Sequence, residues 1–307
     1  MTIETMVTIA TFYLFISLWK SNMMRNISLI ISGLLIFWTF GLIAQPTQTY
    51  RAWNQPVPPF RIAGHLYYVG MSQVTSLLIT TKEGHILIDG GFAESAPIIL
   101  ENVRKLGFRS EDIRILLSTH AHLDHAGGLA EIKEKTKARV YAGFDDSVLL
   151  ARGGRQDFAF GDKLTYPPVT ADVLVKDGDE VILGDAVIRA VATPGHTKGC
   201  TAWSFTVYEN GKPLKVVMIG GMSAPDYQLV RNKNYPQIVS DFETTFRKLK
   251  NMECDIPLEG HGFYFGLEEK AAGKRSFVDP QGYRISVAKA EKAFHAQLKR
   301  QLARSIK

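Results

Sequence analysis

The chain has 307 residues, of which 46% are hydrophobic and 21% are charged, a composition typical of a globular protein with one large domain or two modest ones. Its formal net charge of +6 is spread along the chain, and no run of five or six basic residues indicates a nucleic-acid-binding arm. The two cysteines, Cys200 and Cys254, are far apart and outside any CxxC pair, so neither a thiolate zinc site nor a disulfide framework is indicated.

Residues 1–44 are more apolar than the rest of the chain. This segment has the features of a signal peptide. Arg25 gives a positive charge just after Met23 and Met24, an apolar run follows over 27–44, and the run ends at a small residue, Ala44. Translation would then begin at one of the two methionines. An uncleaved membrane anchor is the alternative, because about 18 apolar residues approach the length of a spanning helix. Both interpretations place the rest of the chain outside the cytoplasm, and cleavage would release it into the periplasm.

Residues 45–60 contain four prolines, which predicts an extended linker or a chain draped over a domain. From residue 61 onwards, strand-like runs alternate with helical patterns, and this alternation predicts an α/β layered domain over 61–307. Strands are expected at 66–69, 76–80, 85–89 and 113–118, helices at 95–106 and 286–306, and a strand-rich stretch at 140–191.

The stretch LSTHAHLDHAGG, residues 117–128, places three histidines and an aspartate in six consecutive positions. A predicted buried strand runs into it, so the cluster lies at the carboxyl end of a strand, where α/β sheets place their sites. His120 and His122 point the same way because side chains of an extended chain alternate, and both can reach one metal ion. Asp124 and His125 follow the bend and reach a neighbouring point. Nitrogen and oxygen donors suit zinc and tolerate iron or manganese.

Two further histidines stand in glycine-containing loops after strand-like runs: His196 in TPGHT and His261 in EGHG. If both join the cluster, His196 completes a three-nitrogen site with one open position, and His261 completes a second site beside it. The two expected ligand sets are His120, His122 and His196, and Asp124, His125 and His261.

The motifs HAHLDH, PGH and EGH, in this order, resemble those of the metallo-β-lactamase fold superfamily, and the resemblance covers residues 61–307. It implies a four-layer αββα sandwich, in which two mixed β-sheets carry helices on their outer faces. The superfamily includes glyoxalase II-like thioesterases, lactonases, phosphodiesterases, sulfatases and β-lactamases. The motifs alone therefore leave the substrate open.

Finer stretches resemble class B β-lactamases of subclass 3, at residues 85–91, 160–168, 193–199 and 223–229. Many other hydrolases of the superfamily carry a metal-bridging aspartate near 219–222, and its absence here disfavours glyoxalase and lactonase activity. The resemblance implies a hydrolase that opens the β-lactam ring of penicillins, cephalosporins and carbapenems with a hydroxide held by two Zn²⁺ ions, giving antibiotic resistance. A lactone or thioester hydrolase and a non-enzymatic zinc-binding protein are the alternatives.

The resemblance also implies roles for individual side chains. Asp124 would orient the attacking hydroxide and help to pass a proton to the leaving nitrogen. Tyr227 would donate a hydrogen bond to the developing oxyanion. Ser223 would bind the carboxylate of the drug, whereas Gly221 stands where many subclass 3 enzymes have a serine.

The surroundings of the site can also be anticipated. Met71 and Phe158 lie in two loops that are expected to frame the cleft with apolar walls. Asp89 and Thr119 are candidate partners for the outer nitrogens of the metal-binding imidazoles. A small-molecule substrate and a monomeric protein are expected, with no nucleic-acid partner, and with membrane contact only through an uncleaved N-terminal segment.

Overall fold

The computed structural model describes residues 48–305 of the chain. The predicted signal peptide or anchor over 1–44 lies outside this range. Among the helices of the described part, none combines the length and the apolar character needed to span a membrane.

Two mixed β-sheets form the centre of the fold. The first has the order β1 to β7, with antiparallel neighbours from β1 to β4 and parallel neighbours from β4 to β7. Its strands are β1 (Phe60–Ala63), β2 (Leu66–Tyr68), β3 (Leu77–Thr81), β4 (Gly84–Ile88), β5 (Ile113–Leu117), β6 (Arg139–Gly143) and β7 (Val173–Val175).

The second sheet has the order β12-β11-β10-β9-β8. Only β11 and β12 run parallel, and the other neighbours are antiparallel. Its strands are β8 (Glu180–Leu183), β9 (Ala186–Ala192), β10 (Thr201–Glu209), β11 (Lys212–Ile219) and β12 (Ile256–Glu259).

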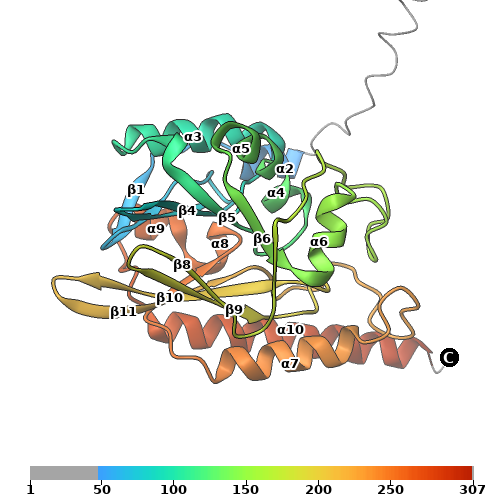
Figure 1. The fold of residues 1–307 in the computed structure, drawn as a ribbon. Coiled ribbons are helices and arrows are strands. Elements are labelled where there is room, and N and C mark those ends of the chain that lie inside the picture. The colour runs from blue at the N-terminus through green and yellow to red at the C-terminus, as the bar shows by residue number, and fades with distance from the viewer. Residues whose placement is uncertain (1–47, 306–307) are drawn as a thin grey trace, which may run out of the picture. The chain divides into compact units, whose positions relative to one another are not determined.

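Helices cover the outer face of each sheet (Figure 1): α3 and α5 lie over the first sheet, and α7 and α10 lie over the second. This arrangement confirms the predicted four-layer αββα sandwich. The helices are α2 (Gln48–Trp53), α3 (Ala96–Lys105), α4 (Leu123–Ala126), α5 (Leu129–Thr136), α6 (Phe144–Ala151), α7 (Ile238–Lys250), α8 (Gly262–Phe265), α9 (Leu267–Ala271) and α10 (Pro280–Ser305), with short 3₁₀ turns at Ala93–Ser95 and Ser110–Asp112.

The packing of the layers explains the burial pattern of the strands. β4 lies inside the first sheet between α3 and the second sheet, and all five of its residues are buried, as expected for a strand covered on both faces. β9 alternates buried and exposed residues over most of its length. Apolar side chains fill the space between the sheets, including Leu77, Ile88, Trp203 and Met218.

The segment predicted as an extended linker over 45–60 is partly helical. Helix α2 places Tyr50 and Trp53 beside Phe92, with a distance of 5.4 Å between the Tyr50 and Phe92 ring centroids. Three of the four prolines that suggested an extended chain follow this helix, and Pro46 lies outside the described residues. The helix differs from an extended linker, but its aromatic packing on Phe92 agrees with the alternative of a chain draped over the domain.

Trp203 ties the second sheet to the strand that leads into the histidine cluster. Its side chain is fully buried, and its indole Nε1 donates a hydrogen bond to the Ser118 carbonyl at 3.2 Å. Trp203→Phe removes this bond and leaves a cavity, so the free energy of unfolding should fall by about 2–4 kcal/mol in urea denaturation. Tyr208→Phe, on an exposed part of the same strand, is the control and should change it by less than about 0.5 kcal/mol. Equal stabilities of the two variants would contradict this role.

Candidate metal centre

The predicted ligands come from three strand ends. His120 and His122 follow β5, and Asp124 and His125 lie in the short helix α4. His196 lies in the turn between β9 and β10, and His261 follows β12. The structure brings them together in the two predicted groups, in each of which the possible ligand atoms lie within 4.8 Å of one another: His120, His122 and His196, and Asp124, His125 and His261.

Hydrogen bonds orient the rings of the first group. The Nδ1–H of His196 donates to the Ser223 carbonyl at 2.7 Å, which leaves the lone pair on Nε2. That Nε2 lies 3.2 Å from Nδ1 of His122. Thr119 donates its hydroxyl hydrogen to Asp89, so its oxygen can accept from Nδ1–H of His120 at 3.1 Å. Nε2 of His120 therefore also carries a free lone pair.

Asp89 supports both groups, as the sequence suggested. One of its oxygens accepts from the Thr119 backbone N–H at 2.8 Å, and the other lies 3.4 Å from Nδ1 of His125. Asp89 is fully buried and has a positive φ of 60°, an uncommon conformation for a residue other than glycine. Such strain is concentrated at functional sites, where surrounding contacts hold it in place.

The second group surrounds one carboxylate oxygen. Oδ2 of Asp124 lies 3.5 Å from Nε2 of His125 and 3.4 Å from Nε2 of His261. Burial alone would raise the pKa of Asp124, but the neighbouring imidazoles outweigh it and hold the pKa below its usual value. Burial likewise lowers the pKa of His125, but Asp124 and Asp89 outweigh it and leave that pKa raised.

The chemistry of the donors fits metal ions. Burial and the other imidazoles lower the pKa of His120 and His122, and they lower those of His196 and His261 to about 4, so these rings are neutral and can donate a lone pair. Both ring nitrogens of His125 are buried without a hydrogen-bond partner. Buried polar atoms are costly unless something pairs with them. The two groups can thus hold metal ions that bind nitrogen and oxygen ligands, such as zinc.

Glycines let the backbone approach the rings closely. A Cβ at position 221 would stand 2.4 Å from Cδ2 of His196, and one at position 260 would stand 2.8 Å from Cε1 of His125. Gly221 does line the cavity beside the metal centre, but the space of its missing side chain is occupied by the His196 ring. The missing side chain thus leaves room for the His196 ring, while Gly221, predicted as a substrate contact, stays in the cavity wall.

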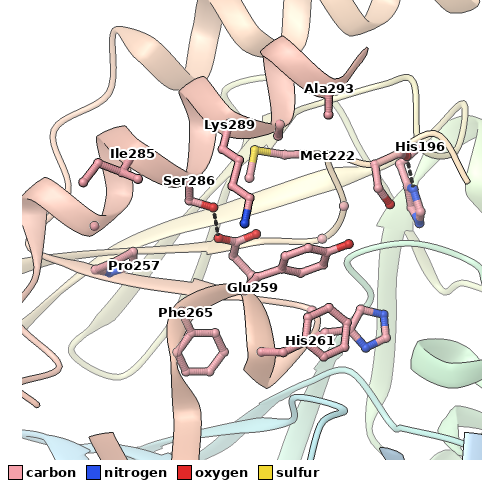
Figure 2. A pocket seen from close by; sticks show the side chains of 18 of the residues that line it. His196, Met222, Pro257, Glu259, His261, Phe265, Ile285, Ser286, Lys289 and Ala293 are labelled. Atoms are coloured by element: carbon pink, nitrogen blue, oxygen red, sulfur yellow. Dashed lines mark hydrogen bonds between the residues drawn. The ribbon is translucent and has the colours of Figure 1, made fainter. Parts of the chain in front are cut away.

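A cavity of about 520 Å³ opens beside both groups, between α8, α10 and the loop after β11. Figure 2 shows His196 and His261 at one end of it and Lys289 and Glu259 further along. Ser286 donates to the Glu259 carboxyl at 2.5 Å, and burial raises the pKa of Glu259 to about 7. Ser223 also lines this cavity, as its predicted role requires.

Of three further predicted contacts, two differ in the structure. Tyr227 is buried, and its hydroxyl donates to the His196 carbonyl at 2.9 Å, so it braces the His196 turn instead of facing an oxyanion. Met71 is fully buried and packs with Val74 and Phe92, away from the cavity. Phe158 remains near the site, where its ring meets that of Tyr227 at a centroid distance of 5.0 Å.

Two aspartates that the sequence did not single out support the site. Asp157 is buried, with Oδ2 3.8 Å from Nε2 of His122, and its Oδ1 accepts backbone hydrogen bonds from Ala159 and Phe160 at 2.8 Å each. Asp157 therefore shapes the aromatic loop and places a carboxylate oxygen near the ring of His122 without a hydrogen bond to it. A turn-forming aspartate in a loop gives no sequence signal for this contact, because its partner is distant in the chain.

Asp146, in α6, joins the two loops that carry the first group. Its Oδ2 accepts from the Ala121 N–H at 2.9 Å and from the Thr197 hydroxyl at 2.6 Å, and its Oδ1 accepts from the Gly199 N–H at 2.7 Å. Burial raises its pKa to about 6 despite these donors. One carboxylate thus fixes the spacing between the 120–122 segment and the turn of His196.

Comparisons with known proteins agree with this geometry. The family model of the metallo-beta-lactamase superfamily matches residues 69–207. A solved metallo-β-lactamase of Cronobacter sakazakii is 41% identical, covers 83% of this chain and 100% of its own, and superimposes with a TM-score of 0.81. BJP-1, a subclass B3 metallo-β-lactamase of Bradyrhizobium japonicum, is 37% identical, with coverages of 82% and 97% and a TM-score of 0.78.

The fold and the two ligand groups define a metal-binding hydrolase. The chain belongs to the metallo-β-lactamase superfamily, and subclass B3 enzymes are among its structural neighbours. The Cronobacter protein is described by a HARLDQ motif, whereas this chain reads HAHLDH and keeps His122 and His125. A hydroxyacylglutathione hydrolase of Rhodopseudomonas palustris is 38% identical over 104 residues, which span 34% of this chain but only 32% of that protein.

The role of Asp146 can be tested by replacing one of its carboxylate oxygens with an NH2 group. In Asp146→Asn, one hydrogen-bond acceptor is lost, so the free energy of unfolding should fall by about 2–3 kcal/mol. The affinity for zinc, measured by competition with a chromophoric chelator, should fall by about tenfold. Asp145→Asn, at the exposed neighbouring position, is the matched control and should leave both values nearly unchanged. An Asp146→Asn variant with wild-type zinc affinity would contradict the role.

Proposed function

We propose that this protein is a zinc-dependent β-lactam hydrolase that opens the ring of penicillins, cephalosporins and carbapenems and thereby gives antibiotic resistance. The observation that carries the proposal is the pair of ligand groups, one of three histidines and one of Asp124, His125 and His261, beside an open cavity. The similarity to subclass B3 β-lactamases over nearly their whole length supports it. The apolar segment 1–44 leads us to propose export to the periplasm.

Two zinc ions are the proposed cofactors. His120, His122 and His196 would hold one, and Asp124, His125 and His261 the other. Zinc supplies Lewis acidity and lowers the pKa of a bound water to about 7. The chain itself supplies the orientation of the imidazoles, through Asp89, Thr119 and the Ser223 carbonyl.

Other side chains have proposed roles around the reacting bond. Asp124 is partly accessible at its carboxylate, so it can take up a proton from the attacking water and deliver it to the departing nitrogen. The Ser223 hydroxyl, in the wall of the cavity, can donate to the carboxylate of the substrate. No side-chain nucleophile is needed, so the reaction proceeds without a covalent acyl-enzyme.

A thioester hydrolase is the second candidate, favoured by the similarity to hydroxyacylglutathione hydrolases. That similarity is confined to about a third of those proteins. At the end of β11, Gly220 packs against Thr119 and Cys200, and Gly221 packs against His196. Asp124 is the single carboxylate in the two ligand groups found among residues 48–305. The bridging aspartate that many other hydrolases of the superfamily carry near 219–222 therefore has no counterpart in these ligand groups. This difference favours a β-lactam substrate over a thioester.

Carbapenem hydrolysis tests the proposal. The zinc-loaded protein should open imipenem, followed as a loss of ultraviolet absorbance, and dialysis against a chelator should reduce the rate by at least about a hundredfold, because metal removal eliminates the Lewis acid. Added zinc should restore the rate. S-lactoylglutathione serves as the competing substrate. Hydrolysis of the thioester without hydrolysis of any β-lactam, or activity that is indifferent to the chelator, would contradict the proposal.

A further inference from the structure

A second cleft, of about 630 Å³, lies between the loop around Phe158 and the loop after β11, and it shares Pro225 with the cavity of Figure 2. Aromatic side chains connect it to the metal centre. The Phe160 ring lies 5.4 Å from that of His122, and Tyr227 donates to the His196 carbonyl. Phe160 and Tyr227 therefore stand between the cleft and the first ligand group, so the cleft lies next to the proposed site of hydrolysis.

The cleft carries an excess of positive charge. Lys163, Arg231 and Lys233 line it, and Asp226 is the one acidic residue in its wall. These four residues together have a charge of +2, a third of the net charge of the whole chain. All three cations are exposed, and none forms an ion pair with an acidic side chain of the described residues. Their charges remain available to a ligand.

The loop that presents two of these cations is held in one shape. Asn232 accepts hydrogen bonds from the backbone N–H groups of Asn234 and Tyr235 at 3.0 and 2.9 Å. Gln301 of α10 accepts from the Leu229 N–H at 2.7 Å. Arg231 itself has a positive φ of 56°, which is maintained by these surrounding contacts. The backbone is thus arranged before a ligand binds, which reduces the ordering cost of binding.

We propose that this cleft binds the side chain attached to the β-lactam ring and selects side chains that carry a carboxylate. The inference rests on the proposed β-lactam hydrolysis and adds a preference to it. Phe158 and Phe160 provide apolar contact for the body of the side chain. Lys163, Arg231 and Lys233 attract an anionic group and repel a cationic one.

Three penicillins make a matched test. Benzylpenicillin, carbenicillin and ampicillin share the ring system and the phenyl side chain, and differ at the α-carbon of that side chain, which carries hydrogen, a carboxylate or an ammonium group. At low ionic strength, kcat/KM of the zinc-loaded enzyme should be highest for carbenicillin and lowest for ampicillin. The difference should lie mainly in KM, because the cleft is separate from the reacting atoms. High salt should weaken the preference, because exposed charges are screened.

The three positively charged side chains of the cleft can be replaced together. The triple variant Lys163→Gln, Arg231→Gln, Lys233→Gln should lower the carbenicillin-to-ampicillin ratio of kcat/KM by about tenfold, or roughly twofold for each exposed charge. The control variant Lys82→Gln, Lys105→Gln, Lys212→Gln changes the net charge equally at exposed positions outside the cleft, and should leave the ratio nearly unchanged.

The outcomes separate the two proposals. If the zinc-loaded enzyme hydrolyses none of the penicillins or carbapenems, the proposed function itself fails. If it hydrolyses benzylpenicillin but shows no preference for carbenicillin over ampicillin, the inference about the cleft fails alone. A ratio that falls equally in the cleft variant and in the control would assign the preference to the overall charge of the protein, and would also overturn the inference.

Discussion

Five imidazole rings and one carboxylate crowd against one another at the ends of three strands, and this crowding is the constraint on which the rest of the site depends. Four of the rings are buried, whereas His261 and Asp124 are partly exposed. The rings of His120 and His125 approach to a centroid distance of 4.2 Å. Burial and mutual repulsion disfavour protonation of most of these rings, so they present lone pairs to one another. Such an arrangement is costly without a positive charge to share. Two metal ions would convert the same crowding into a set of ligands.

Side chains that are not ligands hold this arrangement in place. Asp146 connects the loop of His120 and His122 to the turn of His196, and Asp89 supports rings of both groups. Glycines at positions 220, 221 and 260 remove the side chains that would collide with neighbouring groups. These contacts orient the donors before any ion binds. A cavity lined by His196 and His261 lies beside this arrangement, and so does a basic cleft lined by Tyr227. Our proposal assigns the choice of substrate side chain to the cleft and the metal chemistry to the ligand groups.

Much of the ligand set could be predicted from the sequence because it follows local rules. The spacing of His120, His122, Asp124 and His125 after a buried strand places them in one loop, and glycine turns mark the two distant histidines. Asp146 and Asp157 escaped prediction because their partners are 25 or more residues away in the chain. Burial likewise decides the positions of Tyr227 and Met71, and it depends on packing between layers that no local pattern records.

The six side chains are proposed to bind two zinc ions in the groups seen here. A crystal structure of the zinc-loaded protein, with anomalous data collected above and below the zinc absorption edge, tests it directly. We predict two zinc peaks. The first should lie about 2.0–2.1 Å from one nitrogen each of His120, His122 and His196, and the second at similar distances from Asp124, His125 and His261. A single zinc ion, or ions held by other residues, would contradict the account.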